Sequence, residues 1–499
     1  MQFQLSKSAL KIIIIIVLFS LIGAACLPIS NSENQVQSQG QAQSLPDVGQ
    51  MLPTPLPTRP TYPPGTLVDY TAQTGDTLTA IAAHFNTTVA EIRKANPIIP
   101  EQVTTMPPGL PMQIPIYYKP LWGNPFQIIP DSLFINGPAQ IGFSAAEFVK
   151  DTPGWLKTYR EWVVGQYRSG GEIVDFVAMT FSVSPRLLLT LLEYQSGALS
   201  QETPKVDPEK YPLGYQDGVH IGVYQQLLWA ANLLNNGYYG WRTGDLLSIT
   251  HLDGRTENPD PWQNAATVAL QNYFTKIFND NDYILAVSGE GITKTYTTWF
   301  GDPWINVIPH IEGSLAQPPI RLPFADGRVW AFTGGPHTGW GTGEPLAALD
   351  FAPSSVVGGC TETEEYALAV ADGVVVRTGD AILVLDLDGD GDERTGWEIF
   401  YLHLANNSIV PEGSGLKMGD PVGRPSCEGG KATGTHVHIA RKYNGEWVTA
   451  WGDLPFNLEG WIAQRGLAEY EGSLTKNGKT IIACECSDQF SQIRADGIR

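Results

Sequence analysis

The spacing of apolar residues predicts a small βααβ unit over residues 67–117. A short strand at 69–72 leads through a Gly-Asp-Thr turn into a helix with one apolar face, formed by Leu78, Ile81, Ala82 and Phe85. Thr88 and Glu91 have the spacing of a capping box that opens a second helix. Residues 112–115 supply a closing strand.

Two longer segments with different patterns follow. Residues 118–320 are predicted to be mostly helical, and Ser184-Pro185 provides an N-cap and a first-turn proline before an apolar run. Residues 321–470 carry short Val, Ile and Leu runs between Gly-rich turns, as in an all-β domain. The strand candidates are 367–377, 381–385, 397–404 and 435–441, with a further one at 480–484 in a C-terminal extension over 471–499. The expected fold class is multi-domain, with a βααβ unit, a central mostly-α domain and a C-terminal all-β domain.

The N-terminus is predicted to direct export. Two lysines precede an apolar run, 12–25, which has the length of a signal-peptide core and is short for a membrane-spanning helix. The run ends in Gly23-Ala24-Ala25-Cys26, which resembles the lipobox of bacterial lipoproteins. This resemblance implies a signal peptide over 1–25 and a lipid anchor on Cys26, outside the cytoplasm and facing the cell wall; an ordinary signal peptide is the alternative. Residues 26–66, rich in Gln, Ser and Pro, are predicted to be a disordered tether.

Charge narrows the range of partners. The 499 residues carry a formal charge of −20, which argues against nucleic acid as a partner because phosphate binding requires a basic face. A hydrophobic content of 42% with 14 Trp is ample for buried cores and excludes general disorder.

The βααβ unit resembles a known family of glycan-binding modules. Gly75-Asp76-Thr77-Leu78, Ile81-Ala82, Phe85, Asn96, Gly109 and Ile114-Pro115 look like a LysM domain. LysM domains bind N-acetylglucosamine chains, so the resemblance implies binding to peptidoglycan or chitin; a βααβ fold without glycan affinity is the alternative.

The central segment is similar, more distantly, to the lysozyme-like fold of lytic transglycosylases. An apolar helix ends in Glu193-Tyr194-Gln195-Ser196, and a Gly-x-x-Gln segment follows at 222–225. The residue before Ser196 is an amide, which cannot protonate a glycosidic oxygen as a carboxyl group does. Glu193 lies about 200° away around the helix. The domain is therefore expected to be non-catalytic, with an active glycosidase as the alternative.

Histidines carry the candidate chemistry of the all-β segment. Because side chains alternate along a strand, His436 and His438 of a His-Val-His sequence point to the same face. Together with Leu349-Asp350-Phe351 and Tyr401-Leu402-His403-Leu404, this sequence resembles the M23 family of zinc peptidases, of the lysostaphin/LytM type.

The M23 resemblance implies a role for each of these residues. Asp350 and His438 would bind Zn²⁺ together with an upstream histidine, and His403 and His436 would flank the reacting water. His337 is the nearest upstream histidine, although it is farther from Asp350 than in the common family spacing, and a flexible Gly-rich loop, 338–345, is expected to return it to the metal. His310 is the next candidate. Two imidazoles and one carboxylate would form an open site with a fourth position for water.

An acidic turn is a second candidate for cation binding. Asp386, Asp388 and Asp390 occupy positions one, three and five of a calcium loop, with a glycine at position six. The twelfth position is Trp397, and Glu398 comes one residue late. A solvated acidic hairpin turn is favoured, with Ca²⁺ as the alternative.

The cysteines after Cys26 number four, which suggests disulfides in an exported chain. Cys360 and Cys427 lie close in sequence to Asp350 and His436, so a bridge between them would brace the segments that hold the site. Cys484 and Cys486 are expected to pair with each other or to stay free.

Two classes of function remain open. The first is a membrane-anchored zinc metalloendopeptidase that binds the cell wall and hydrolyses peptide cross-links of peptidoglycan. The second is a catalytically degenerate scaffold or activator in wall remodelling. Glycan cleavage by the helical domain is a further alternative.

Overall fold

The computed structural model describes residues 59–119, 123–205, 210–305, 307–356 and 358–497. The predicted signal peptide, Cys26 and the tether up to residue 58 lie outside the described residues. Within the described ranges, no helix is both long and apolar enough to cross a membrane. The described end of the tether is engaged, because Arg59 forms an ion pair with Asp260 at 2.5 Å.

The N-terminal unit has the predicted βααβ order. Its elements are β1 (Thr66–Thr71), α2 (Leu78–His84), α3 (Val89–Ala95) and β2 (Pro111–Ile116), and β1 pairs antiparallel with β2. Thr77 caps α2, and the capping box of Thr88 and Glu91 is formed at the start of α3. Ile81, Phe85 and Ile114 are fully buried in its core.

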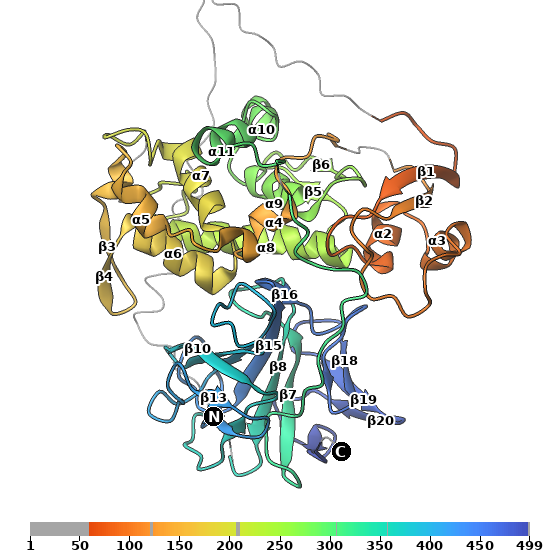
Figure 1. Ribbon diagram of the computed structural model, residues 1–499, viewed down its shortest axis with the longest axis vertical. Coiled ribbons are helices and arrows are strands. Elements are labelled where there is room, and N and C mark those ends of the chain that lie inside the picture. Colours follow the sequence, from red (N-terminus) through yellow and green to blue (C-terminus); the bar gives the residue numbers. More distant parts are fainter. Residues whose placement is uncertain (1–58, 120–122, 206–209, 306, 357, 498–499) are drawn as a thin grey trace, which may run out of the picture. The chain divides into compact units, whose positions relative to one another are not determined.

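The middle of the chain is mostly helical, as expected, with two short hairpins added (Figure 1). Its main helices are α5 (Ala145–Lys150), α6 (Gly170–Phe181), α7 (Pro185–Ser196), α8 (Gly222–Thr243), α9 (Ala265–Phe274), α10 (Asp280–Ala286) and α11 (Ile292–Phe300), after the short α4 (Asp131–Phe134). The hairpins are β3 (Arg160–Val163) with β4 (Gln166–Ser169), and β5 (Ile249–Thr250) with β6 (Thr256–Glu257). Ser184 caps α7 and Pro185 occupies its first turn, as predicted.

A nine-stranded sheet organises the C-terminal region. Its strand order is β13-β10-β11-β12-β15-β8-β7-β21, with β16 paired to β15. The bounds are β7 (Val329–His337), β8 (Ala348–Pro353), β10 (Gly373–Gly379), β11 (Ile382–Asp386), β12 (Trp397–Leu402), β13 (Gly415–Leu416), β15 (Val437–Tyr443), β16 (Glu446–Val448) and β21 (Gln492–Arg494). Smaller sheets are formed by β9 (Ala367–Leu368) with β14 (Pro421–Gly423), and by β17 (Asn457–Leu458), β18 (Trp461–Arg465), β19 (Gly472–Lys476) and β20 (Lys479–Ile482).

The structure changes several of the expected strand limits. The run 367–377 is two strands, because β9 leaves the main sheet to pair with β14. Residue 436 precedes β15 and forms only an isolated bridge to Ser426. The extension over 471–499 continues the fold, because β19 pairs with β18 and β21 pairs with β7. Strand pairing between segments that are distant in sequence cannot be predicted from the polar turns that bound each strand.

The two faces of the main sheet belong to different cores. Val437 and Ile439 of β15 point into an all-β core with Tyr401 and Leu383. On the opposite face, Ala440 and its neighbours in β11 and β12 share one apolar core with helices α6 to α9; these neighbours are Ile382, Val384, Phe400 and Leu402. His438 alternates with Val437 and lies on this helix-packed face, where its ring is 6.2 Å from that of Phe400.

Candidate metal centre and neighbouring cavity

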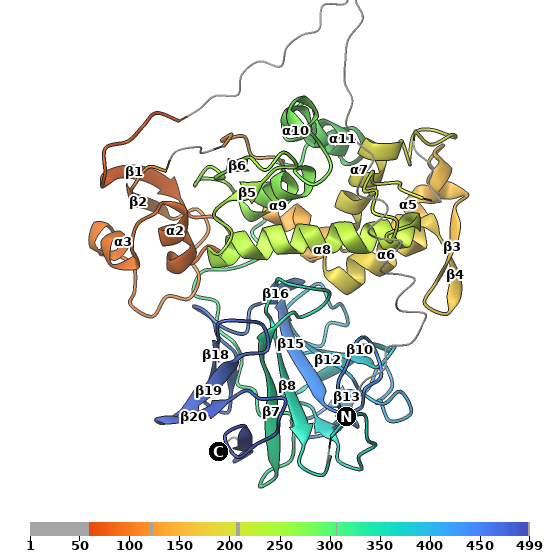
Figure 2. The same cartoon turned by 180° about the vertical axis from the view of Figure 1, so that it is seen from behind.

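Three side chains from adjacent strands converge at one point of the sheet. His337 ends β7, Asp350 lies in β8 and His438 lies in β15; Figure 2 shows these three strands side by side. Asp350 and His438 are direct partners in the β8–β15 ladder. His337 Nε2, Asp350 Oδ1 and His438 Nδ1 lie 3.0 to 3.3 Å from one another.

This arrangement fits a zinc ion. Ligand atoms at about 2.1 Å from a tetrahedral zinc are separated by roughly 3.4 Å, close to the distances found. Asp350 Oδ1 is buried and, in the described part of the chain, has no hydrogen-bond partner. Such an orphaned oxygen beside two imidazole nitrogens is a favourable ligand set for a divalent ion, and three protein ligands leave a position open.

Backbone carbonyls orient both imidazoles. His337 Nδ1 lies 2.8 Å from the carbonyl oxygen of Gly335, and His438 Nε2 lies 3.2 Å from that of Gly339. When each of these nitrogens donates its N–H to the carbonyl, the opposite nitrogen presents a lone pair to the metal position.

Electrostatics favours the metal-binding states of two ligands, Asp350 and His438, whereas burial lowers the pKa of His337 and the neighbouring Asp350 outweighs it and raises that pKa. Burial opposes ionisation of Asp350, but the neighbouring His337 and His436 outweigh it and hold the pKa of the carboxyl group well below its usual value. Burial lowers the pKa of His438, which favours the neutral imidazole. An ionised carboxylate and a neutral imidazole are the forms that bind metal.

Two further histidines flank the metal position. The rings of His403 and His436 are 4.5 Å apart, and His436 Nε2 lies 3.7 Å from Asp350 Oδ2. His403 Nδ1 faces the carbonyl oxygen of Glu428 at 2.9 Å, and His436 Nδ1 faces that of Gly434 at 2.7 Å. Burial, followed by the nearby charges of His436 and His438, lowers the pKa of His403 to about 4. His403 can therefore present a neutral Nε2 that accepts a proton.

The loop between His337 and Asp350 is held in place, unlike the flexible return expected from its glycines. Asn232 of α8 bonds to both the backbone N and the hydroxyl of Thr342, and Asn236 accepts from the backbone N of Glu344. His337 is brought back by antiparallel pairing, because it lies opposite Ala348 in the β7–β8 ladder. A Gly-rich sequence does not reveal that a distant helix fixes it.

Tyr470 is a neighbour of the site that no sequence pattern indicated. Its ring stacks on His337 at 4.3 Å with an interplanar angle of 19°. It adjoins β19, so its position depends on the strand pairing of the C-terminal extension. The stacked ring restricts rotation of His337.

The remaining candidates lie elsewhere. His310 Nε2 contacts Glu446 at 2.6 Å in a separate buried cluster, so it does not join the three converging ligands. Glu193 accepts from the backbone N of Leu199 and Ser200, which occupies the carboxylate in the turn after α7. The structure joins Cys360 to Cys427 and Cys484 to Cys486.

We expect replacement of Gly334 by alanine to weaken zinc binding by about 10- to 100-fold. A Cβ at this position would lie 2.5 Å from Asp350 Oδ2, so the carboxylate must move away from the two imidazoles. Zinc titration with a competing chelator measures the change. Gly415→Ala is the matched control, because its added Cβ meets no atom within 4 Å; equal zinc affinity of both variants would contradict the argument.

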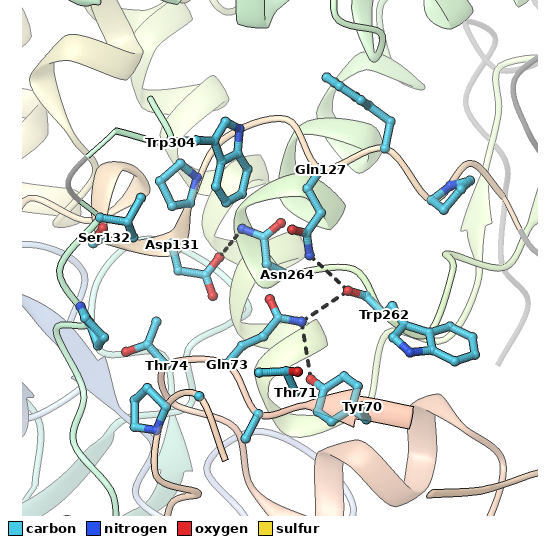
Figure 3. Close-up of a pocket in the computed structure, with 18 of the residues that line it drawn as sticks. Tyr70, Thr71, Gln73, Thr74, Gln127, Asp131, Ser132, Trp262, Asn264 and Trp304 are labelled. Carbon is cyan, nitrogen blue, oxygen red and sulfur yellow. Dashed lines mark hydrogen bonds between the residues drawn. The ribbon is translucent and has the colours of Figure 1, made fainter. Parts of the chain in front are cut away.

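A separate cavity of about 780 Å³ lies between β1 and the helical region. Figure 3 shows the rings of Trp262, Trp304 and Tyr70 around amide and carboxylate groups. Asn264 Nδ2 donates to Asp131, while Asn264 Oδ1 is buried and, among the described residues, accepts no hydrogen bond. Aromatic walls with a few free polar acceptors suit an uncharged ligand that donates hydrogen bonds.

Comparison with known proteins assigns relatives to each region. Residues 70–104 match the model of the LysM domain, and residues 127–313 match that of the LasA N-terminal domain. Protease LasA of Pseudomonas aeruginosa is 24% identical over 320 residues, which cover 60% of this chain and 72% of LasA. The beta-lytic metalloendopeptidase of Lysobacter enzymogenes is 27% identical over 173 residues, covering 32% of this chain and 90% of that protein.

Among solved structures, the M23 metalloprotease pseudoalterin is 25% identical with a TM-score of 0.29, covering 34% of this chain and 96% of that one. The match of the middle region to the LasA N-terminal domain is a relationship that the sequence patterns did not indicate, and the lysozyme-like resemblance of this region stays a prediction. The chain thus carries a LysM domain and a LasA-like N-terminal domain, and its sequence is similar to protease LasA and to the beta-lytic metalloendopeptidase.

Proposed function

We propose that this chain is an exported, lipid-anchored zinc metalloendopeptidase that hydrolyses peptide cross-links of peptidoglycan. The observation that carries the proposal is the convergence of His337, Asp350 and His438 within 3.3 Å of one another, with His403 and His436 beside them. Homology to LasA and to the beta-lytic enzymes supports a peptidase rather than a binding protein.

The side chains divide the chemical work. A zinc ion held by the three ligands would supply Lewis acidity toward a peptide carbonyl and toward water. His403, neutral because burial lowers its pKa to about 4, can accept a proton from the attacking water at Nε2. His436, whose Nδ1 is engaged by the Gly434 carbonyl, can turn Nε2 toward developing negative charge on the carbonyl oxygen if that nitrogen carries a proton.

Mass spectrometry of digested peptidoglycan tests the proposal. New amino termini in stem or bridge peptides, lost on chelation and restored by Zn²⁺, are the expected result. New reducing sugar ends would instead support glycan cleavage by the helical domain. Zinc binding with neither product would support the degenerate scaffold.

The LysM domain is proposed to hold the enzyme on its polymer by binding glycan. The cavity beside β1 adds aromatic rings and the free amide oxygen of Asn264, which could contact sugar hydroxyls. Pelleting with insoluble peptidoglycan should therefore weaken in Trp304→Ala, whose ring lines the cavity and is 39% exposed. Trp162→Ala is the control, because this Trp is 59% exposed in β3. Equal pelleting of both variants would contradict a role of the cavity in glycan binding.

A further inference from the structure

The hairpin between β11 and β12 gathers three carboxylates at the end of the main sheet. Asp386 is the last residue of β11, and Asp388 and Asp390 follow in the connecting loop. One oxygen from each of the three lies within 4.8 Å of the others. Asp386 is buried, whereas Asp388 and Asp390 are exposed at the tip. An acidic cluster of this kind is common on protein surfaces and does not by itself indicate a ligand.

Glu398 independently points to a cation at this hairpin. Its side chain is fully buried, and neither carboxylate oxygen has a hydrogen-bond partner among the described residues. Glu398 lies directly opposite Asp386 in the β11–β12 ladder, so both side chains leave the same face of the sheet a few ångströms apart. Burying an unpartnered carboxylate costs several kcal/mol, and two adjacent ones repel each other.

The surrounding cations are already engaged with other acids. Arg394 binds Asp392 at 2.6 Å, and Arg377 binds Glu393 at 2.6 Å. Lys442 is the ladder partner of Glu398, but its ammonium group lies 3.8 Å from Glu393. Within the described ranges, no ion pair joins Lys or Arg to Asp386, Asp388 or Asp390, which leaves their charge uncompensated.

The loop folds back toward the strand that carries Glu398. A Cβ on Gly396 would meet the carboxylate of Asp388, which therefore lies over the start of β12. Asp386 accepts hydrogen bonds from the backbone N of residues 388, 389 and 391, so the loop closes around this carboxylate. The outer carboxylates also accept hydrogen bonds within the loop, Asp388 from the backbone N of Asp390, and Asp390 from the backbone N of Asp392 and the hydroxyl of Thr395, so the loop is fixed by its own carboxylates.

We propose that Asp386, Asp388 and Asp390 bind a calcium ion at this hairpin, and that the ion also compensates the buried carboxylate of Glu398, which lies outside the cluster of three. Oxygen donors alone, supplied by one loop at positions one, three and five, suit Ca²⁺ better than the smaller and more strictly octahedral Mg²⁺. The site differs from a complete calcium loop because the twelfth position is Trp397. The acid nearest to that position, Glu398, comes one residue later and is buried in β12. The inference does not depend on the proposed peptidase function.

Calcium titration of the zinc-loaded chain by calorimetry tests the site. We expect one additional Ca²⁺ per chain with a Kd of about 10⁻⁴–10⁻³ M, the range of extracellular calcium modules. Tb³⁺ offers a second readout, because Trp397 beside the loop should sensitise its luminescence. Ca²⁺ should also raise the melting temperature of the unmodified protein. The variant carrying Asp388→Asn and Asp390→Asn should lose both the calcium binding and this rise in melting temperature. Both residues are exposed, so the variant should fold, which circular dichroism checks.

Asp380→Asn is the matched control, because Asp380 is an exposed acid in the turn before β11, at the opposite end of that strand. Its calcium binding should equal that of the wild type. Equal calcium uptake by the double variant and the control, or Mg²⁺ binding as tight as Ca²⁺ binding, would overturn the proposal. Unchanged calcium affinity in Glu398→Gln would overturn the part assigned to Glu398.

Discussion

Replacing His438 by alanine is expected to remove zinc from the chain and to lower hydrolysis of peptidoglycan peptides by on the order of 10³-fold or more. His438 supplies one of three converging ligand atoms, and its ladder partner Asp350 supplies the second. The remaining histidine and carboxylate cannot hold the ion with the same geometry, and Asp350 loses one of the imidazoles that stabilise its charge. Metal analysis after dialysis, together with turnover of a soluble cross-link peptide, measures both losses.

His220→Ala is the control for this change. His220 is bound to Asp217 in the loop before α8, outside the converging ligands, so its loss should leave zinc content and turnover unchanged. The same measurements on His337→Ala check the ligand whose spacing departs from the common pattern. Full zinc and full turnover in that variant would show that another group completes the site.

Replacing Glu446 by glutamine is expected to reduce the free energy of unfolding by about 3–5 kcal/mol. Glu446 begins β16 and contacts Arg242 of α8 at 3.1 Å, His310 at 2.6 Å and the Tyr238 hydroxyl at 2.7 Å. The side chains of these four residues are at most 9% exposed. An amide at position 446 leaves Arg242 with Asp131 as its remaining ion-pair partner. Urea denaturation compares this variant with Glu290→Gln, which breaks an exposed helix pair with Lys294 and should cost under about 1 kcal/mol.

The same carboxylate should make stability depend on pH. Burial opposes ionisation of Glu446, but Arg242 and His310 outweigh it and lower its pKa to about 2. A carboxyl group with a depressed pKa in the folded state contributes its full stability above the unfolded value, about 4.5, and loses it as the pH falls toward 2. Unfolding free energies measured over this window should fall less steeply in Glu446→Gln. Parallel curves for the two proteins would contradict this role of Glu446.

Local patterns predicted the elements that local interactions create. The capping box of Thr88 and Glu91 and the N-cap at Ser184 each depend on a few neighbouring residues. The contacts that complete the site depend on distant pairing. The Gly-rich loop is fixed by Asn232 and Asn236 of α8, and Tyr470 reaches His337 through a strand of the C-terminal extension. No periodic pattern in the sequence predicts these two contacts.

Buried charge was the other feature hidden from sequence patterns. Arg242 and Glu446 are separated by about two hundred residues, and neither belongs to a recognisable motif. Their pairing follows from helix α8 lying against one face of the sheet. A charge in a sequence is normally assigned to the surface, and only the tertiary structure shows that this pair is desolvated.

The apolar core shared by the helices and the sheet makes these regions one cooperative unit. Ile382, Val384 and Phe400 face helices rather than water. A chain shortened to begin at residue 321 would expose these side chains as a hydrophobic patch that promotes aggregation. Heating should accordingly melt helices and sheet in a single transition, with no temperature at which the strands persist alone. The boundary that separates two segments in the sequence is therefore not a boundary in folding.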